Sequence, residues 1–175
     1  MTASENKGYI QLYTGNGKGK TSAAFGMAIR AAMTGKKVYI AQFVKSMKYS
    51  ETRIEEYVDN ITIHQFGRGC YLLRDVEEED KLAAQRGLQE CRIALNSGDW
   101  DMVILDEVTI ALYFRLFSID DLLLVLNEKA EHTEVIMTGR SAPQQLVERA
   151  DLVTEMTEVK HYYEQGVLSR PGFDC

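Results

Sequence analysis

Apolar and polar positions alternate along this chain with two different periods. Short apolar runs bounded by turn residues predict buried strands, and longer stretches with apolar residues three to four apart predict helices. The strand-like runs are about 9–13, 38–44, 61–66, 102–105, 135–137 and 151–156. The helical patterns cover 22–33, a short stretch ending near 58, 77–96, 122–129 and a short helix that begins near 141. This alternation predicts an α/β protein with a predominantly parallel sheet of about six strands and helices on both faces.

The length and composition predict one ordinary globular domain. No internal repeat or linker divides the 175 residues, so we expect one domain over 1–175, with 1–7 as a flexible N-terminus and 157–175 as a C-terminal tail without clear periodicity. The chain has 45% hydrophobic and 26% charged residues, which is typical of a soluble protein. Its net charge of −6 argues against a nucleic-acid-binding surface.

Three further features favour a cytoplasmic protein. No apolar run approaches the roughly 20 residues that span a bilayer. The first residues lack the apolar core of a signal peptide. The three cysteines, at 70, 91 and 175, are widely spaced and form neither a metal pair nor a disulfide framework.

A glycine-rich loop joins the first predicted strand to the first predicted helix. Residues 13–21 read Tyr-Thr-Gly-Asn-Gly-Lys-Gly-Lys-Thr. Glycines let backbone N–H groups close around an anion, the helix N-terminus adds partial positive charge, and a lysine reaches the outer phosphates. The hydroxyl of Thr21 is placed to bind Mg²⁺. A standard P-loop would need glycine at position 14, which is Thr14, so this loop is one residue short.

A second motif, Met-Val-Ile-Leu-Asp-Glu at 102–107, has the pattern of a Walker B strand. An apolar strand that ends in carboxylates beside a P-loop can hold the metal or its waters, and we expect either Asp106 or Glu107 to face it. Arg140 follows the fifth strand and so is expected in the ligand crevice. Arg30 alone is typical of a solvated or ion-paired helix residue. His161 is a candidate anion contact.

Several catalytic arrangements are absent from the sequence. It has no His-Arg-Asp loop, no Ser-His-Asp pattern and no carboxylate marked as the base that a γ-phosphate transfer would require. The loop by itself still permits a nucleotide kinase or small phosphotransferase, or a nucleotide-dependent binding or switch protein.

Taken together, these motifs resemble the P-loop type ATP:corrinoid adenosyltransferases. The shared segments are 14–21, 42–45, 49–51, 105–107, 138–140, 150–156 and 159–161, and the resemblance covers about 8–172. It implies a P-loop NTPase-like (RecA-like) fold. It also implies that the Co(I) centre of a reduced corrinoid attacks the 5′ carbon of ATP and that the whole triphosphate leaves, in adenosylcobalamin biosynthesis or corrinoid salvage. Because Co(I) is itself the nucleophile, no general base is needed.

The resemblance also implies roles for individual residues. The residues that wrap the triphosphate would be Gly15, Asn16, Gly17, Lys18, Gly19, Lys20 and Thr21, with the nucleotide reversed relative to most P-loop enzymes. Lys20 and Glu107 would be catalytic, and Arg30 and Arg140 would contact the nucleotide. Thr21 and Glu107 would bind Mg²⁺ (or Mn²⁺), with Asp106 in support. A flavoprotein reductant and a homodimer are implied partners.

One segment departs from the family pattern. Many members have Gly-x-Gly-Phe-Thr-Trp where this chain has residues 67–72, with Cys70 and Leu72 in place of aromatic residues. Those aromatic residues press on the corrin face, so the departure bears on how this chain binds its corrinoid.

Overall fold

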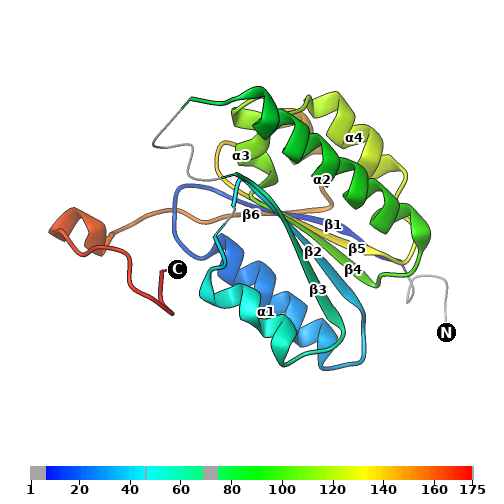
Figure 1. Cartoon of the computed structure of the whole chain (residues 1–175), viewed down its shortest axis with the longest axis horizontal. Helices are drawn as coiled ribbons and strands as arrows, with labels where there is room; N and C mark the ends of the chain where they lie inside the picture. The colour runs from blue at the N-terminus through cyan, green and yellow to red at the C-terminus, as the bar shows by residue number, and fades with distance from the viewer. Residues whose placement is uncertain (1–6, 46, 69–74, 175) are drawn as a thin grey trace.

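Six parallel strands form one sheet in the order β3-β2-β4-β5-β1-β6 (Figure 1). The structure is a computed structural model that describes residues 7–45, 47–68 and 75–174. The strands are β1 (Ile10–Thr14), β2 (Val38–Phe43), β3 (Ile61–Phe66), β4 (Met102–Asp106), β5 (Glu134–Thr138) and β6 (Leu152–Glu155). The predicted parallel α/β sheet is confirmed, and β5 lies between the loop-bearing strand β1 and the carboxylate strand β4.

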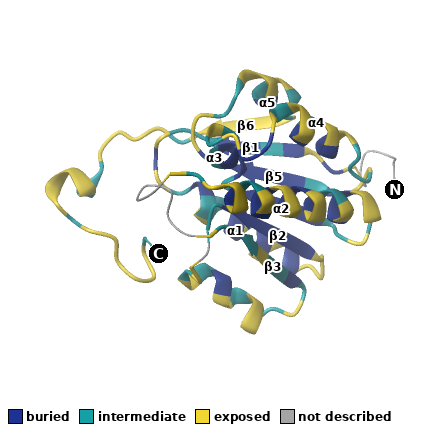
Figure 2. Ribbon diagram, turned by 45° about the horizontal axis from the view of Figure 1, so that its top comes forward, coloured by how far each residue is buried: buried dark blue, intermediate teal, exposed yellow. Residues whose placement is uncertain are grey.

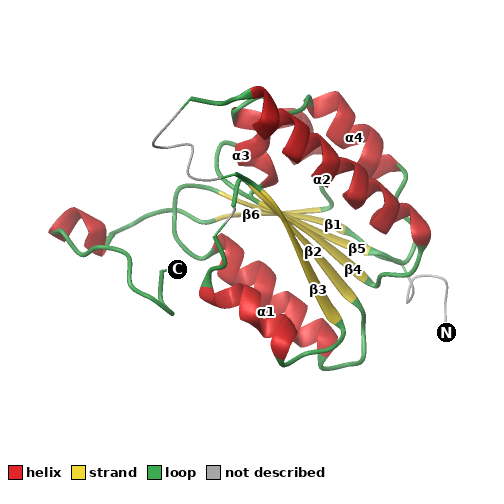
Figure 3. Ribbon diagram, viewed as in Figure 1, coloured by secondary structure: helices red, strands yellow, loops and turns green. Residues whose placement is uncertain are grey.

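Helices cover both faces of the sheet, as expected (Figure 3). The helix α1 (Lys20–Ala32) lies on one face together with the 3₁₀ helix η2 (Ser50–Glu56). The helices α2 (Glu78–Ser97), α3 (Val108–Tyr113) and α4 (Ile119–Asn127) lie on the other face. The short helix α5 (Gln144–Arg149) precedes β6, and the 3₁₀ helix η3 (Tyr162–Gln165) lies in the C-terminal tail.

The strand β4 shows how the sequence builds two cores. Met102 and Ile104 pack with α1, whereas Val103 and Leu105 pack with α2 and α4. Successive side chains on a strand point to opposite faces, so a strand covered on both sides must be apolar throughout. Every residue of β4 is buried, and Figure 2 shows that its neighbours β2 and β5 are largely buried as well.

Two local features differ from the sequence-based expectations. The strand expected over 38–44 ends at Phe43 because Val44 has a φ of 55°, outside the extended range. The helix α3 was not predicted, because its N-cap residue Glu107 makes no side-chain capping hydrogen bond and the helix contains β-branched residues that favour strands. The apolar stripe expected on the long helix is confirmed, since Leu88 and Cys91 are buried within α2.

Some sequence-based expectations concern residues that the structure does not describe. Most of the N-terminal stretch 1–7 and the departing residues Cys70 and Leu72 lie outside the described residues. Within the described ranges, no helix has both the length and the apolar composition needed to cross a bilayer.

Candidate nucleotide-binding site

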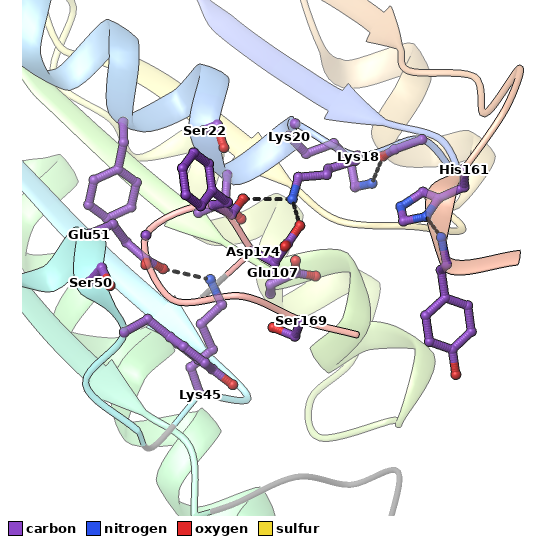
Figure 4. Close-up of a pocket in the computed structure, with 18 of the residues that line it drawn as sticks. Lys18, Lys20, Ser22, Lys45, Ser50, Glu51, Glu107, His161, Ser169 and Asp174 are labelled. Carbon is purple, nitrogen blue, oxygen red and sulfur yellow. Dashed lines mark hydrogen bonds and ion pairs between the residues drawn. The ribbon is translucent and has the colours of Figure 1, made fainter. Parts of the chain in front are cut away.

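An open cleft of about 910 Å³ lies at the carboxyl ends of the strands. It is lined by the second half of the glycine loop, the start of α1, the segment after β2, Glu107, Arg140 and the C-terminal tail. Figure 4 shows the lysines of the loop and the carboxylates of the facing segments turned toward this space. In a parallel α/β sheet, ligands bind at this edge.

The loop is held in a closed ring by its own lysine. The Lys20 ammonium donates to the carbonyl oxygen of Gly15 at 2.8 Å and to that of Gly17 at 2.7 Å. Gly19 has a φ of 113°, a conformation that favours glycine, and the helix after it has no side-chain cap. Uncapped N–H groups in a first helical turn are suited to bind an anion. Burial, reinforced by the charge of Arg140, lowers the pKa of Lys20.

Asp106 is the centre of a buried hydrogen-bond network. Its side chain is fully buried and accepts four hydrogen bonds. Oδ1 accepts from the hydroxyls of Thr21 at 2.9 Å and Thr138 at 2.7 Å. Oδ2 accepts from the amide of Gln42 at 3.1 Å and the ammonium of Lys45 at 2.8 Å. Because protein donors already engage both oxygens, Asp106 is suited to orient Thr21 rather than to bind a metal directly.

Glu107 presents the more accessible carboxylate. It has a φ of 60° and its backbone N–H donates to the Thr138 hydroxyl at 2.9 Å, so the chain turns sharply after β4. Its side chain lines the cleft, and partial burial together with the Asp106 charge raises its pKa. The hydroxyl of Thr21 and the carboxylate of Glu107 are oxygen donors of the kind that Mg²⁺ prefers, and both line the cleft, so these residues fit the expected metal.

The C-terminal tail closes one side of the cleft. The Lys18 ammonium forms an ion pair with Asp174 and donates to the Tyr162 hydroxyl at 2.9 Å and the Phe173 carbonyl at 2.6 Å. The Tyr162 hydroxyl also donates to Asp174, and Arg170 donates to the same carboxylate at 3.1 Å. The cations Lys18 and Arg170 thus meet on one tail carboxylate. Figure 4 shows Lys18 and Asp174 side by side at the cleft.

The structure brings most of the expected residues together, but not all of them. Gly17, Lys18, Gly19, Lys20 and Thr21 line the cleft with Glu107 and Arg140. Gly15 and Asn16, in the first half of the loop, do not line it. Arg30 lies in the last turn of α1, where its Nη1 is 3.9 Å from the sulfur of Met27, and it does not line the cleft.

Sequence reasoning gave no specific role to several residues of the site. Gln42, Lys45 and Thr138 surround Asp106, and Glu51 lies 3.4 Å from the ammonium of Lys45. Gln42, Lys45 and Thr138 share a signal that was available, because each lies at or just after the carboxyl end of a predicted strand. Asp174 had no comparable signal, since its contacts depend on how the tail folds back.

The fold and the site define a P-loop nucleotide-binding protein. Comparison with known proteins narrows this class. The family model for the ATP:corrinoid adenosyltransferases BtuR/CobO/CobP matches residues 6–175. The chain belongs to this family.

Curated relatives match this chain over most of their lengths. The corrinoid adenosyltransferase of Escherichia coli (strain K12) is 34% identical over 172 residues, which is 98% of this chain and 88% of that protein. The corrinoid adenosyltransferase CobA of Salmonella typhimurium (strain LT2) is also 34% identical over 172 residues, with the same coverage. The corrinoid adenosyltransferase of Pseudomonas aeruginosa is 32% identical over 174 residues, covering 98% of this chain and 86% of that protein.

Proposed function

We propose that this chain transfers the 5′-deoxyadenosyl group of ATP to the Co(I) centre of a reduced corrinoid and releases triphosphate, in adenosylcobalamin biosynthesis or corrinoid salvage. The observation that carries the proposal is the family match over residues 6–175. The cleft is consistent with it, because Lys18, Lys20 and Arg140 line the place where a triphosphate would bind.

The chemistry of this transfer makes modest demands on the protein. An electron pair of Co(I) forms the cobalt–carbon bond while the bond between C5′ and its oxygen breaks, and that second electron pair leaves on the triphosphate. The attacking atom carries no proton, so no general base is required. The protein must align the two reactants and stabilise the charge that develops on the leaving group.

The residues of the loop supply this stabilisation. Lys20 would exchange its bonds to the carbonyl oxygens of Gly15 and Gly17 for phosphate oxygens, while the first N–H groups of α1 point to the same anion. Lys18 would exchange Asp174 for phosphate in the same way. Thr21 and Glu107 would hold Mg²⁺ (or Mn²⁺), with Asp106 fixing the Thr21 hydroxyl. When bound, the metal neutralises part of the triphosphate charge.

Arg30 is assigned to the other end of the nucleotide. It lies ten residues after Lys20, which is about 15 Å along a helix axis. Because Arg30 lies that far along the helix and does not line the cleft, a contact with ATP would be with a part of the nucleotide away from the phosphates that Lys20 binds. The expected homodimer and flavoprotein reductant stay predictions of the family resemblance.

The product distinguishes this proposal from its alternatives. The purified chain is incubated with Mg²⁺, ATP and a chemically reduced corrinoid, and the cobalt–carbon bond is followed spectrally while phosphates are identified by chromatography. We expect one triphosphate for each alkylated corrinoid and no product without corrinoid. Formation of ADP with a phosphorylated product would favour a phosphotransferase, and ATP binding without any turnover would favour a switch protein.

A further inference from the structure

The backbone at the end of β2 is bent to turn one lysine into the cleft. Phe43 and Val44 both pack on the α2 side of the sheet, so the usual alternation of strand side chains is broken there. Val44 has a φ of 55°, which is rare and costly for a β-branched residue. Strain of this kind costs on the order of 1–3 kcal/mol and persists only where the surroundings enforce it.

Gly67, directly after the neighbouring strand β3, supports this bend. Its N–H donates to the carbonyl oxygen of Lys45 at 3.0 Å. A Cβ atom at position 67 would lie 2.4 Å from the backbone nitrogen of Lys45, so only glycine leaves room for the chain there. The position of Lys45 is therefore fixed by a strained residue before it and by a close backbone contact beside it.

The side chain of Lys45 ends among carboxylates. Its ammonium lies 2.8 Å from Oδ2 of Asp106 and 3.4 Å from Oε1 of Glu51, and the side chain is only 16% exposed. Glu107 also lies near enough for its negative charge to stabilise the Lys45 ammonium. Burial by itself would lower the pKa of Lys45, but the charges of Asp106, Glu51 and Glu107 outweigh it, so the pKa is raised and the ammonium stays charged.

Without this ammonium, the same oxygens would form an attractive site for a divalent cation. Asp106 and Glu51 each place a carboxylate oxygen within 3.4 Å of the Lys45 nitrogen, and carboxylate oxygens are the ligands that Mg²⁺ and Mn²⁺ prefer. Like charges gathered in a partly buried place repel each other strongly unless a cation lies between them. The ammonium of Lys45 takes that place, on the side of Asp106 opposite to Thr21.

We propose that Lys45 is a built-in counter-cation that keeps free divalent metal away from Asp106, so that metal enters the cleft only with the nucleotide and binds on the side of Thr21 and Glu107. Lys45 is thereby a specificity-determining residue for the metal. This role rests on the nucleotide site proposed above, but its test needs neither ATP nor corrinoid.

The test measures binding of Mn²⁺ to the nucleotide-free protein, with free Mn²⁺ followed by electron paramagnetic resonance. We expect weak binding by the wild-type chain and binding at least about tenfold tighter by Lys45→Met, because a positive charge within a few ångströms of the metal is lost. Lys45→Arg keeps the charge and should bind as weakly as the wild type. Lys48→Met is the matched control, since Lys48 is exposed in the same segment and its loss should change nothing.

A second set of variants keeps the test decisive if Lys45→Met folds poorly. Lys45→Gln removes the charge but retains a donor for Asp106, and it should also gain Mn²⁺ affinity. Adding Glu51→Gln to either variant should reverse most of the gain. If neither neutral variant folds alone, Mn²⁺ should restore a cooperative thermal transition to them.

Three results would overturn the role of Lys45. The first is tight Mn²⁺ binding by the nucleotide-free wild type. The second is a folded neutral variant whose Mn²⁺ affinity stays within twofold of the wild type. The third is failure of Mn²⁺ to restore folding to both neutral variants. These Mn²⁺ measurements do not depend on adenosyl transfer. The role of Lys45 and the proposed function can therefore be refuted independently of each other.

Discussion

Replacing Thr138 by valine tests the network around Asp106. Thr138 is fully buried, and its hydroxyl both donates to Oδ1 of Asp106 at 2.7 Å and accepts the N–H of Glu107 at 2.9 Å. Valine has nearly the same shape but neither donates nor accepts a hydrogen bond. The substitution therefore removes two hydrogen bonds without opening a cavity.

The expected cost follows from the charge and burial of the groups left behind. A hydrogen bond to a charged group contributes roughly 1.5–3 kcal/mol, and an unsatisfied buried N–H costs about 1–3 kcal/mol. We therefore expect Thr138→Val to lower the free energy of unfolding by about 3 kcal/mol or more. Thr133→Val is the matched control. Thr133 is also fully buried, but among the described residues its hydroxyl donates only to the neutral carbonyl of Trp100, a bond that contributes about 1 kcal/mol.

Equilibrium unfolding in urea measures both losses, and calorimetry measures binding of ATP with Mg²⁺. Thr138→Val should lose about 2 kcal/mol more stability than Thr133→Val and should also bind the nucleotide more weakly, because the Asp106 oxygen that it releases is the one that orients Thr21. Equal stability losses in the two variants, or unchanged nucleotide binding by Thr138→Val, would refute this account of Asp106.

Three further predictions concern other parts of the molecule. Lys20→Ala should lower kcat for adenosyl transfer by about 10²–10³-fold, as expected for loss of one preorganised donor, and unchanged turnover at saturating ATP would contradict its role. Asp174→Asn removes the anion that competes with phosphate for Lys18, so ATP should bind a few fold tighter by calorimetry; weaker binding would mean instead that the tail supports the nucleotide. Burial raises the pKa of the Cys91 thiol, so a Cys70→Ser/Cys175→Ser variant should react with a thiol reagent at pH 8 only after unfolding, and fast reaction of the folded variant would contradict that burial.

The elements were largely predictable because their periodicity reflects how they are buried. The strand β4 is apolar throughout, and both of its faces are covered. The long helix α2 carries its apolar residues at helical spacing, and these face the sheet. The prediction failed at α3, whose six residues are mostly apolar and partly β-branched and whose start is not marked by a side-chain capping hydrogen bond.

The site was predictable where its residues lie in one motif or, like Arg140, directly after a predicted strand. Lys20 and Thr21 share the loop, and Asp106 and Glu107 share the end of one strand. The partners of Asp106 lie at the ends of predicted strands, but their contact with Asp106 was not predictable because it depends on the order of the strands: Lys45 follows β2 and Thr138 ends β5, the two neighbours of β4. The contact between Lys18 and Asp174 spans 156 residues and depends on the path of the tail.

The missing residue of the loop has a structural explanation. Thr14, where a standard P-loop has its first glycine, is still part of β1 and pairs with Glu155 of β6. The loop begins only at Gly15, whose φ of 97° starts the turn. The pairing with β6 therefore keeps residue 14 in the strand, and the loop is one residue shorter.

The same pairing gives the loop glycines a second use. The N–H of Gly17 donates to the carbonyl oxygen of Met156 at 2.6 Å, and Cβ atoms at Gly15 and Gly17 would lie only 2.4 and 2.7 Å from that oxygen. The N–H of Gly17 is thus already engaged within the protein. An entering triphosphate would then be bound by the ammoniums of Lys18 and Lys20 and the first turn of α1, on the side where the cleft is open. The C-terminal tail begins at Met156, directly after β6, and carries the Asp174 that pairs with Lys18. The strand β6 therefore both shortens the loop and leads into the segment whose carboxylate competes with phosphate for Lys18.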